Sequence, residues 1–102
     1  MQHDLYANPN RRGRSVYPFV VQLQANIVEG QDHIVAPLTP ADVMPGAASR
    51  IRPHVRHDNQ DYVVVMRLMG PLPARLLRHS IGSVAPWRDD ITLAPDWLFF
   101  GI

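Results

Sequence analysis

Histidine is the residue type in this sequence with the widest chemistry, and there are five histidines beside no cysteine. His54 and His57 form the closest pair, within an alternating stretch that predicts a β-strand. Side chains three positions apart on a strand point to opposite faces, whereas a metal needs ligands that converge. We therefore interpret the histidines as ordinary strand and loop residues, and we expect no metal and no other cofactor.

Nucleophilic and acid–base groups are present, but their spacing defines no active site. The serines, Ser15, Ser49, Ser80 and Ser83, lie outside the glycine-flanked motif that presents the nucleophile of many hydrolases. All ten basic residues are arginines, which excludes chemistry that depends on a lysine amine. Asp89 and Asp90 follow Pro86, as is typical of the start of a helix. We predict that the protein is not an enzyme.

Two clusters have the chemistry to bind a partner. Arg11, Arg12 and Arg14 could contact phosphate or an acidic peptide, although a solvated loop explains them more simply. Large apolar side chains fill the last six residues, Trp97–Ile102. We expect Trp97 and Leu98 to anchor a helix in the core. Consecutive helical residues point around the full circle, so at least one of the two phenylalanines that follow should face outward.

Length and composition limit the architecture. The chain has 102 residues and 46% hydrophobic residues, so we expect one folded domain over residues 1–102. A net charge of +1 is too balanced to suggest nonspecific nucleic-acid binding. The longest apolar run, Trp97–Phe100, is too short to span a membrane, and the first residues do not resemble a signal peptide. We therefore expect a cytoplasmic protein without a membrane partner.

Short strands dominate the expected secondary structure. Alternation predicts strands over residues 1–7, 16–23 and 33–38, and a hairpin with arms over residues 51–57 and 62–69. Gly70–Pro73 is expected to end the second arm, and residues 74–81 fit a strand or a helix equally well.

A helix is expected after Pro86, with Trp87, Ile91, Ala94 and Leu98 on one face. Pro95 conflicts with a regular helix and predicts a kink or a restart there. The fold class is therefore mainly β, a small antiparallel sheet or barrel with a C-terminal helix.

The chain resembles the CcdB family, the toxins of plasmid and chromosomal toxin–antitoxin pairs, from end to end. The resemblance rests on Met1-Gln2 and Tyr6, the stretch around Phe19-Val20 and Gln24, and Ile27-Val28. It continues through Val35-Ala36-Pro37-Leu38, which resembles a Val-Ile-Pro-Leu strand, to the family's aromatic-Gly-Ile terminus, here Phe100-Gly101-Ile102. The resemblance implies an SH3-like barrel with a C-terminal helix that forms a homodimer, with Leu98 near the twofold interface.

The resemblance also implies the function. Family members bind the A subunit of DNA gyrase through the C-terminal end and trap the gyrase–DNA cleavage complex. A CcdA-like antitoxin with a disordered segment removes the toxin. The toxin–antitoxin complex represses its own operon, and the antitoxin contacts the operator DNA. We expect that segment to be acidic and to meet part of the arginine-bearing surface.

The gyrase contacts carry over residue by residue. Gly101 and Ile102 match the family's last two residues, and Ile27 and Val28 match a pair of isoleucines. Two positions depart from the family. Phe100 stands where the family has a tryptophan that stacks on a gyrase arginine, and Asp96 stands where it has an asparagine. Phenylalanine stacks on a guanidinium more weakly than tryptophan does.

Two alternatives remain open at this point. Other toxins with an SH3-like barrel cleave RNA, which requires an acid–base set and a basic groove. A diverged homologue could instead keep dimerisation and antitoxin binding without toxicity, and the two departures at the C-terminal end would mark it.

Overall fold

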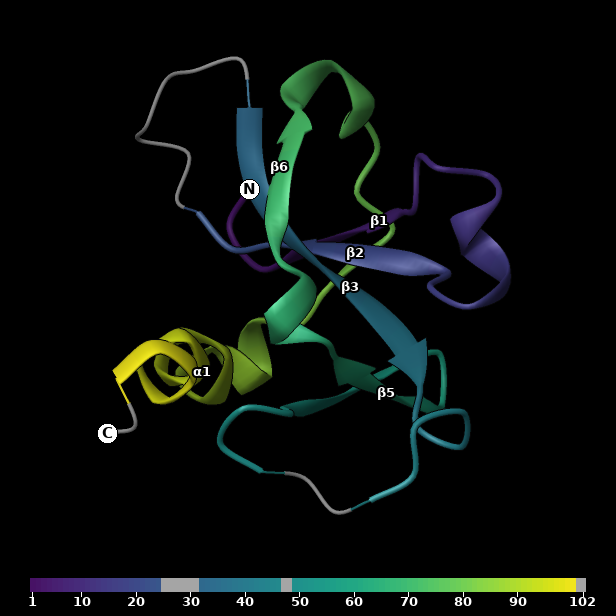
Figure 1. Ribbon diagram of the computed structural model, residues 1–102. Helices are drawn as coiled ribbons and strands as arrows, with labels where there is room; N and C mark the ends of the chain where they lie inside the picture. Colours follow the sequence, from purple (N-terminus) through teal and green to yellow (C-terminus); the bar gives the residue numbers. More distant parts are fainter. Residues whose placement is uncertain (25–31, 47–48, 101–102) are drawn as a thin grey trace.

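An antiparallel sheet curls nearly into a barrel, and one helix follows it at the C-terminus (Figure 1). The computed structural model describes residues 1–24, 32–46 and 49–100, apart from the side chain of Phe100. The seven strands are β1 (Asp4–Ala7), β2 (Phe19–Gln22), β3 (Asp32–Pro40), β4 (His54–His57), β5 (Gln60–Val64), β6 (Gly70–Pro73) and β7 (Gly82–Ser83). Their order is β4-β5-β3-β2-β1-β7, with β6 also paired to β3. The mainly β fold class expected from the sequence is therefore confirmed.

Strand β3 organises the sheet because it has three neighbours. Strand β2 pairs along one edge, while β5 and β6 share the other edge, opposite Leu38 and Val35 respectively. Pro37 lies at the junction between β5 and β6, where its carbonyl accepts a hydrogen bond from the backbone N–H of Val65. A proline is tolerated in this central strand because the N–H it lacks would face the gap between two partner strands.

The second arm of the expected hairpin is shorter than predicted. Strand β5 ends at Val64, and a 3₁₀ turn, η2 (Met66–Leu68), follows it. The five residues between Val64 and Gly70 must span only two residues of β3, so the extra chain forms a turn that buries Met66. The expectation that Gly70–Pro73 merely ends a strand was wrong, since these residues form β6. Two prolines fit there because β6 is an edge strand among the described residues.

Both faces of the central strands are buried. Leu5, Val21 and Ala36 point into the main core, which β5 and the C-terminal helix complete. Their neighbours Tyr6, Val20 and Val35 form a second, smaller cluster on the opposite face. Leu72 and Leu77 cover that cluster, so the segment after β6 closes the outer side of the sheet. This two-sided burial explains why apolar residues occupy consecutive positions in these strands.

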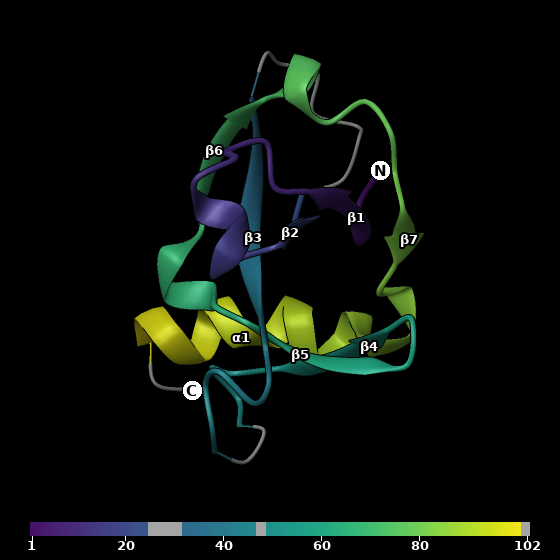
Figure 2. The same cartoon turned by 90° about the vertical axis from the view of Figure 1, so that its right-hand side faces the viewer.

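The helix α1 (Arg88–Phe100) packs against the main core through Ile91, Ala94 and Leu98. A short 3₁₀ turn with Pro86 in its first positions leads into it, and Asp89 and Asp90 occupy its first turn, as the sequence predicted. The helix runs through Pro95 without a second start. Figure 2 shows α1 alongside the β4–β5 hairpin, with the 3₁₀ turn η3 (Ala74–Leu76) at the opposite end of the molecule.

Candidate functional site

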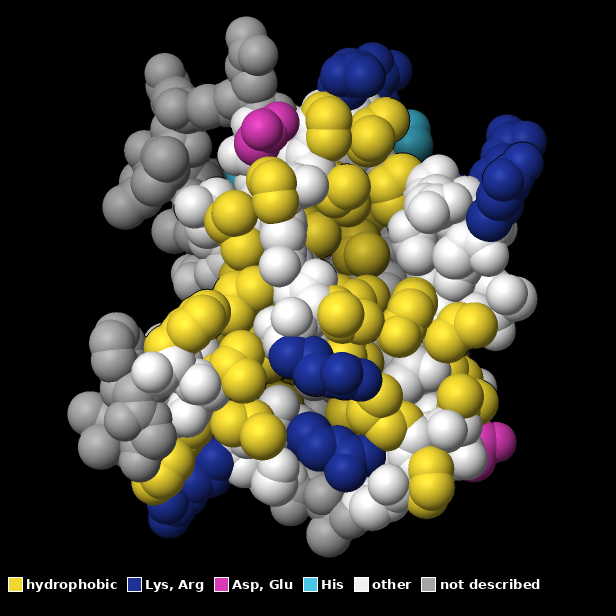
Figure 3. Space-filling view, viewed as in Figure 1, with side chains coloured by type: hydrophobic (Ala, Val, Ile, Leu, Met, Phe, Trp, Pro, Cys, Tyr) yellow, Lys and Arg dark blue, Asp and Glu magenta, His cyan; other side chains and the backbone are white. Residues whose placement is uncertain are grey.

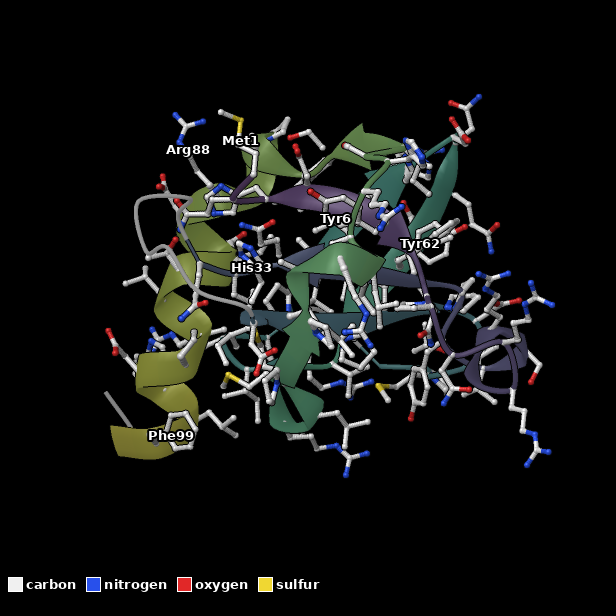
Figure 4. All side chains as sticks on the ribbon, turned by 90° about the horizontal axis from the view of Figure 1, so that it is seen from above. Met1, Tyr6, His33, Tyr62, Arg88 and Phe99 are labelled. Carbon is white, nitrogen blue, oxygen red and sulfur yellow. The ribbon has the colours of Figure 1, made fainter. Side chains whose placement is uncertain are left out.

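The outer side of α1 near its C-terminal end is the exposed part of the site expected from the sequence. Phe99 has 67% of its surface exposed, and Figure 4 shows it at the far end of the helix from Arg88. Asp96 is also exposed, one turn earlier. Leu98 points the other way and packs against the core. The prediction that one of the two terminal phenylalanines faces outward is therefore confirmed for Phe99.

Several predicted contact residues lie outside the described part of the chain. They are Ile27, Val28, Gly101, Ile102 and the side chain of Phe100. Asp96 is thus the predicted gyrase contact whose side chain the structure describes. The helix is nevertheless anchored before this end, because Ile91 and Ala94 are almost fully buried.

Trp97 does not join the core as expected. It is half-buried and lies beneath Arg50, whose guanidinium carbon is 3.9 Å from the ring centroid. The reason is geometric, since Leu98 and Ala94 already occupy the inward face of the helix. Trp97 and Leu93 line a cleft of about 370 Å³ between α1 and the residues that precede and begin β4. The sequence did not identify Arg50 as part of the site, because Trp97, the residue that it contacts, is far away along the chain.

An apolar groove of about 390 Å³ lies on the other side of α1, next to Leu98. We call it the Leu98 groove, and its lining is Met44, Pro45, Ile51, Arg52, Val65, Met66, Arg67 and Leu98. Arg52 holds the 41–46 loop in place, because its guanidinium donates hydrogen bonds of 3.1 Å to the carbonyls of Met44 and Pro45. Arg67 is exposed and pairs with no carboxylate among the described residues. The groove therefore combines an apolar floor with positive charge.

A second groove brings the predicted arginine cluster together with residues that sequence reasoning missed. We call it the arginine groove, and its volume is about 490 Å³. Arg11 and Arg14 line it from the loop after β1, whereas Arg12 does not. Arg75, Arg78 and His79 line it from the loop after β6. These two loops are about 60 residues apart in sequence, so no local pattern could have predicted their meeting.

Tyr6 also lines the arginine groove. Burial, and then the nearby Asp4 carboxylate, raise the pKa of Tyr6 above its ordinary value. The phenol is therefore neutral at physiological pH, and it accepts a hydrogen bond of 3.0 Å from the amino group of Met1. It adds no negative charge to the groove.

The described residues contain no group of three or more histidine, aspartate or glutamate side chains that could hold a metal. Nor does any helix in the described ranges have the length and apolar character needed to cross a bilayer. The notable features are surfaces, namely the exposed helix end, the Leu98 groove and the arginine groove. Such surfaces are typical of a protein that acts by binding other molecules.

Comparison with known proteins supports this interpretation. The sequence matches the family model described as CcdB protein over residues 2–101. A search of curated proteins found no significant match. The matched region spans essentially the whole chain and agrees with the barrel and C-terminal helix described above. The chain therefore belongs to the CcdB family, the gyrase-poison toxins of toxin–antitoxin pairs.

Proposed function

We propose that this protein is the toxin of a type II toxin–antitoxin pair that binds the A subunit of DNA gyrase and traps the gyrase–DNA cleavage complex. The observation that carries the proposal is the family match over residues 2–101. The contact is the C-terminal end of α1 with Asp96, Phe100, Gly101 and Ile102, together with Ile27 and Val28. The protein acts as an inhibitor and performs no chemistry of its own.

The packing of α1 supports this use of the helix end. Ile91 and Ala94 fix the helix on the core, so its end has little freedom to lose when it binds. The last turn carries no basic residue, and Asp96 adds a negative charge near it. This charge suits an arginine-bearing target, which the family's stacking contact also requires.

Dimerisation is the second part of the proposal. We place Leu98 near the twofold interface, where it would bring the helix ends of two copies onto one target. Figure 3 shows hydrophobic side chains spread over the face that carries β6 and η2. Exposed Leu68 and half-buried Met69 and Leu72 belong to these elements or adjoin them. A second copy would remove such apolar surface from water.

The antitoxin is the third part. An acidic segment that folds on binding fits the Leu98 groove, because its apolar side chains would meet Val65 and Met66 while its carboxylates meet Arg67. The sequence suggested Arg11, Arg12 and Arg14 for this contact. The Leu98 groove suits the segment better because it offers both kinds of interaction. A segment bound there would also lie next to the dimer interface.

A gyrase cleavage-trapping assay with the purified protein tests the proposal. We expect linear DNA to accumulate when gyrase, supercoiled plasmid, ATP and the protein are incubated together and then denatured. The matched control is the protein with residues 100–102 deleted, which should remain folded and dimeric but trap no cleaved DNA. Absence of trapping by the intact protein would contradict the proposal. Cleavage of RNA by the same preparation would favour the endoribonuclease alternative.

A further inference from the structure

The arginine groove concentrates positive charge that the rest of the described molecule does not neutralise. Arg11, Arg14, Arg75 and Arg78 line it together with His79, and no acidic side chain does. All four arginines are exposed. None of them forms an ion pair among the described residues, where the arginine that pairs with a carboxylate is Arg56, with Asp61. Four like charges that repel one another across one groove favour a ligand of high negative charge density.

The backbone holds part of this array in place. The Nε of Arg14 donates to the carbonyl of Asn8, and the Nε of Arg78 donates to the carbonyl of Arg75 at 2.9 Å. These bonds use one nitrogen of each guanidinium and leave the two terminal nitrogens for a ligand. The fork geometry of those nitrogens suits phosphate oxygens. The two loops are therefore pre-arranged for anion binding.

Three acidic residues lie on the helix, whereas Asp32 is nearer the groove and lines a neighbouring pocket together with Arg75. Asp89, Asp90 and Asp96 are all on α1, which lies away from the loops that carry η1 (Gly13–Ser15) and η3 in both Figure 1 and Figure 2. Although the net charge is only +1, the positive charges of the groove and the negative charges of the helix lie on different parts of the molecule. A polyanion would repel the helix and attract the groove, so it would meet the molecule in one orientation.

The residues that line the groove favour one of two classes of polyanion. An acidic peptide gains most of its affinity from apolar anchors that enter deep pockets. The apolar residues that line this groove are Ala7, Pro9 and Leu76 beside Tyr6, so it offers few large apolar side chains against which such anchors could pack. Duplex DNA needs no anchor, since it presents about one negative charge per 1.7 Å of helix axis. Polar, positively charged contact surfaces are also typical of protein–DNA interfaces.

We propose that the arginine groove binds the phosphate backbone of duplex DNA, so that the protein itself contributes nonspecific DNA affinity. This goes beyond the proposed function and beyond the family resemblance, under which operator DNA is contacted through the antitoxin. The contacts are made by the guanidinium groups of Arg11, Arg14, Arg75 and Arg78, and they read no sequence. The helix end that we assign to gyrase stays free, because it lies at a different part of the molecule.

Fluorescence anisotropy with a labelled 30-base-pair duplex of arbitrary sequence tests this inference. The protein without antitoxin is titrated between about 50 and 200 mM salt. Four phosphate contacts predict a slope of about −3.6 for log K against log salt concentration. The Arg75→Gln/Arg78→Gln variant should reduce the magnitude of that slope by about 1.8. The Arg56→Gln/Arg88→Gln variant loses the same charge outside the groove and should keep the slope of the parent protein.

Three results would overturn the inference. The first is no binding of the duplex by the parent protein at 50 mM salt. The second is equal loss of binding in both double variants, which would indicate a net-charge effect. The third is tighter binding of a glutamate-rich peptide than of the duplex, with the same loss in Arg75→Gln/Arg78→Gln, which would make the groove a protein-binding site. Circular dichroism confirms folding, and gyrase trapping is measured separately, so either proposal can fail alone.

Discussion

Phe100 is the residue at which the proposed gyrase contact departs most from the family. The ring is smaller than the tryptophan it replaces and stacks on a guanidinium more weakly. Its neighbour Phe99 is aromatic too and 67% exposed. The two phenylalanines can therefore be compared by substitution. The family resemblance assigns Phe100 to the gyrase contact, and it does not assign Phe99.

Substitution of Phe100 should change gyrase trapping in both directions. Phe100→Trp should strengthen the stacking contact by up to about 1 kcal/mol, a gain of at most roughly fivefold in affinity. Phe100→Ala should lose more than that, because it removes the whole aromatic contact. Phe99→Ala is the control and should retain most of the trapping. Unchanged trapping by a folded Phe100→Ala protein would show that the helix end is not the gyrase contact.

Gly82 is a structural position where a single methyl group matters. A Cβ atom there would lie 2.8 Å from Cε1 of His57, whose ring packs edge-on against Phe19 with a centroid distance of 5.4 Å. Gly82→Ala should therefore destabilise the protein by about 1 to 3 kcal/mol, because the imidazole must leave this packing. Gly70→Ala is the control, since a methyl group at that position would have no neighbouring atom within 4 Å. Equal denaturation midpoints for the two variants in urea would contradict this account.

At the scale of elements, the helix α1 contains a proline in its interior, where this residue normally disfavours helix formation. Pro95 sits in the helix interior, where it removes one backbone hydrogen bond and its ring crowds the carbonyl four residues earlier. The helix persists because burial of Ile91 and Ala94 before this position, and of part of Leu98 after it, stabilises the helix against the core. Tertiary packing therefore outweighs an unfavourable local preference.

Pro95→Ala should raise the stability of the protein. The substitution restores the missing hydrogen bond and should stabilise the fold by about 1 to 3 kcal/mol. Thermal unfolding followed at 222 nm measures the effect, with Pro86→Ala as the control at the helix start, where proline costs little. A lower melting temperature for Pro95→Ala would mean that the half-buried ring contributes more through packing than it costs the helix.

The connection between β5 and β6 is the other element-scale feature of interest, because it forms part of the Leu98 groove. Its 3₁₀ turn buries Met66 and leaves Arg67 exposed at the Leu98 groove. A continuous strand through this region would have placed Met66 and Arg67 on opposite faces of the sheet. The turn instead allows both residues to line the Leu98 groove, Met66 as part of its buried floor and Arg67 as an exposed charge.

At the scale of the whole molecule, the proposed mechanism requires two copies. Leu98 is half-buried against the core and lines the Leu98 groove, so part of its surface is available to a partner. Sedimentation at micromolar concentration should give about twice the mass of the 11.5 kDa chain. Leu98→Gln should shift the sample toward monomer, whereas Leu93→Gln, on the exposed side of α1, should not. A monomeric parent protein would remove the paired helix ends from the mechanism.

Antitoxin binding should depend on salt if charge contributes to it. A synthetic peptide of the cognate antitoxin's acidic segment should bind less tightly as salt rises. Arg67→Gln should weaken binding by about two- to fivefold, as expected for an exposed ion pair. Arg56→Gln, which lies outside the Leu98 groove, serves as the control. If the affinity changes neither with the salt concentration nor with the Arg67→Gln substitution, the groove binds the segment through its apolar floor alone.

Features that depend on the local order of residues could be predicted from the sequence. Alternation at period two located most strands, including β3 and the β4–β5 turn, because side chains on a strand alternate between faces. Helical spacing identified Ile91, Ala94 and Leu98 as the inward face of α1. Residue order along the whole chain indicated the family, and through it the barrel, which the family match and the fold confirm.

Features that depend on contacts between distant segments became visible in the folded molecule. Strand β6 exists because β3 is long enough to pair with two strands on one edge, a fact that Gly70–Pro73 does not encode locally. Trp97 lies beneath Arg50 because the inward positions of the helix were already filled. The arginine groove forms where the loops after β1 and β6 meet. In each case the feature depends on the burial and pairing of residues that are far apart in sequence. A local sequence pattern holds no information about such contacts.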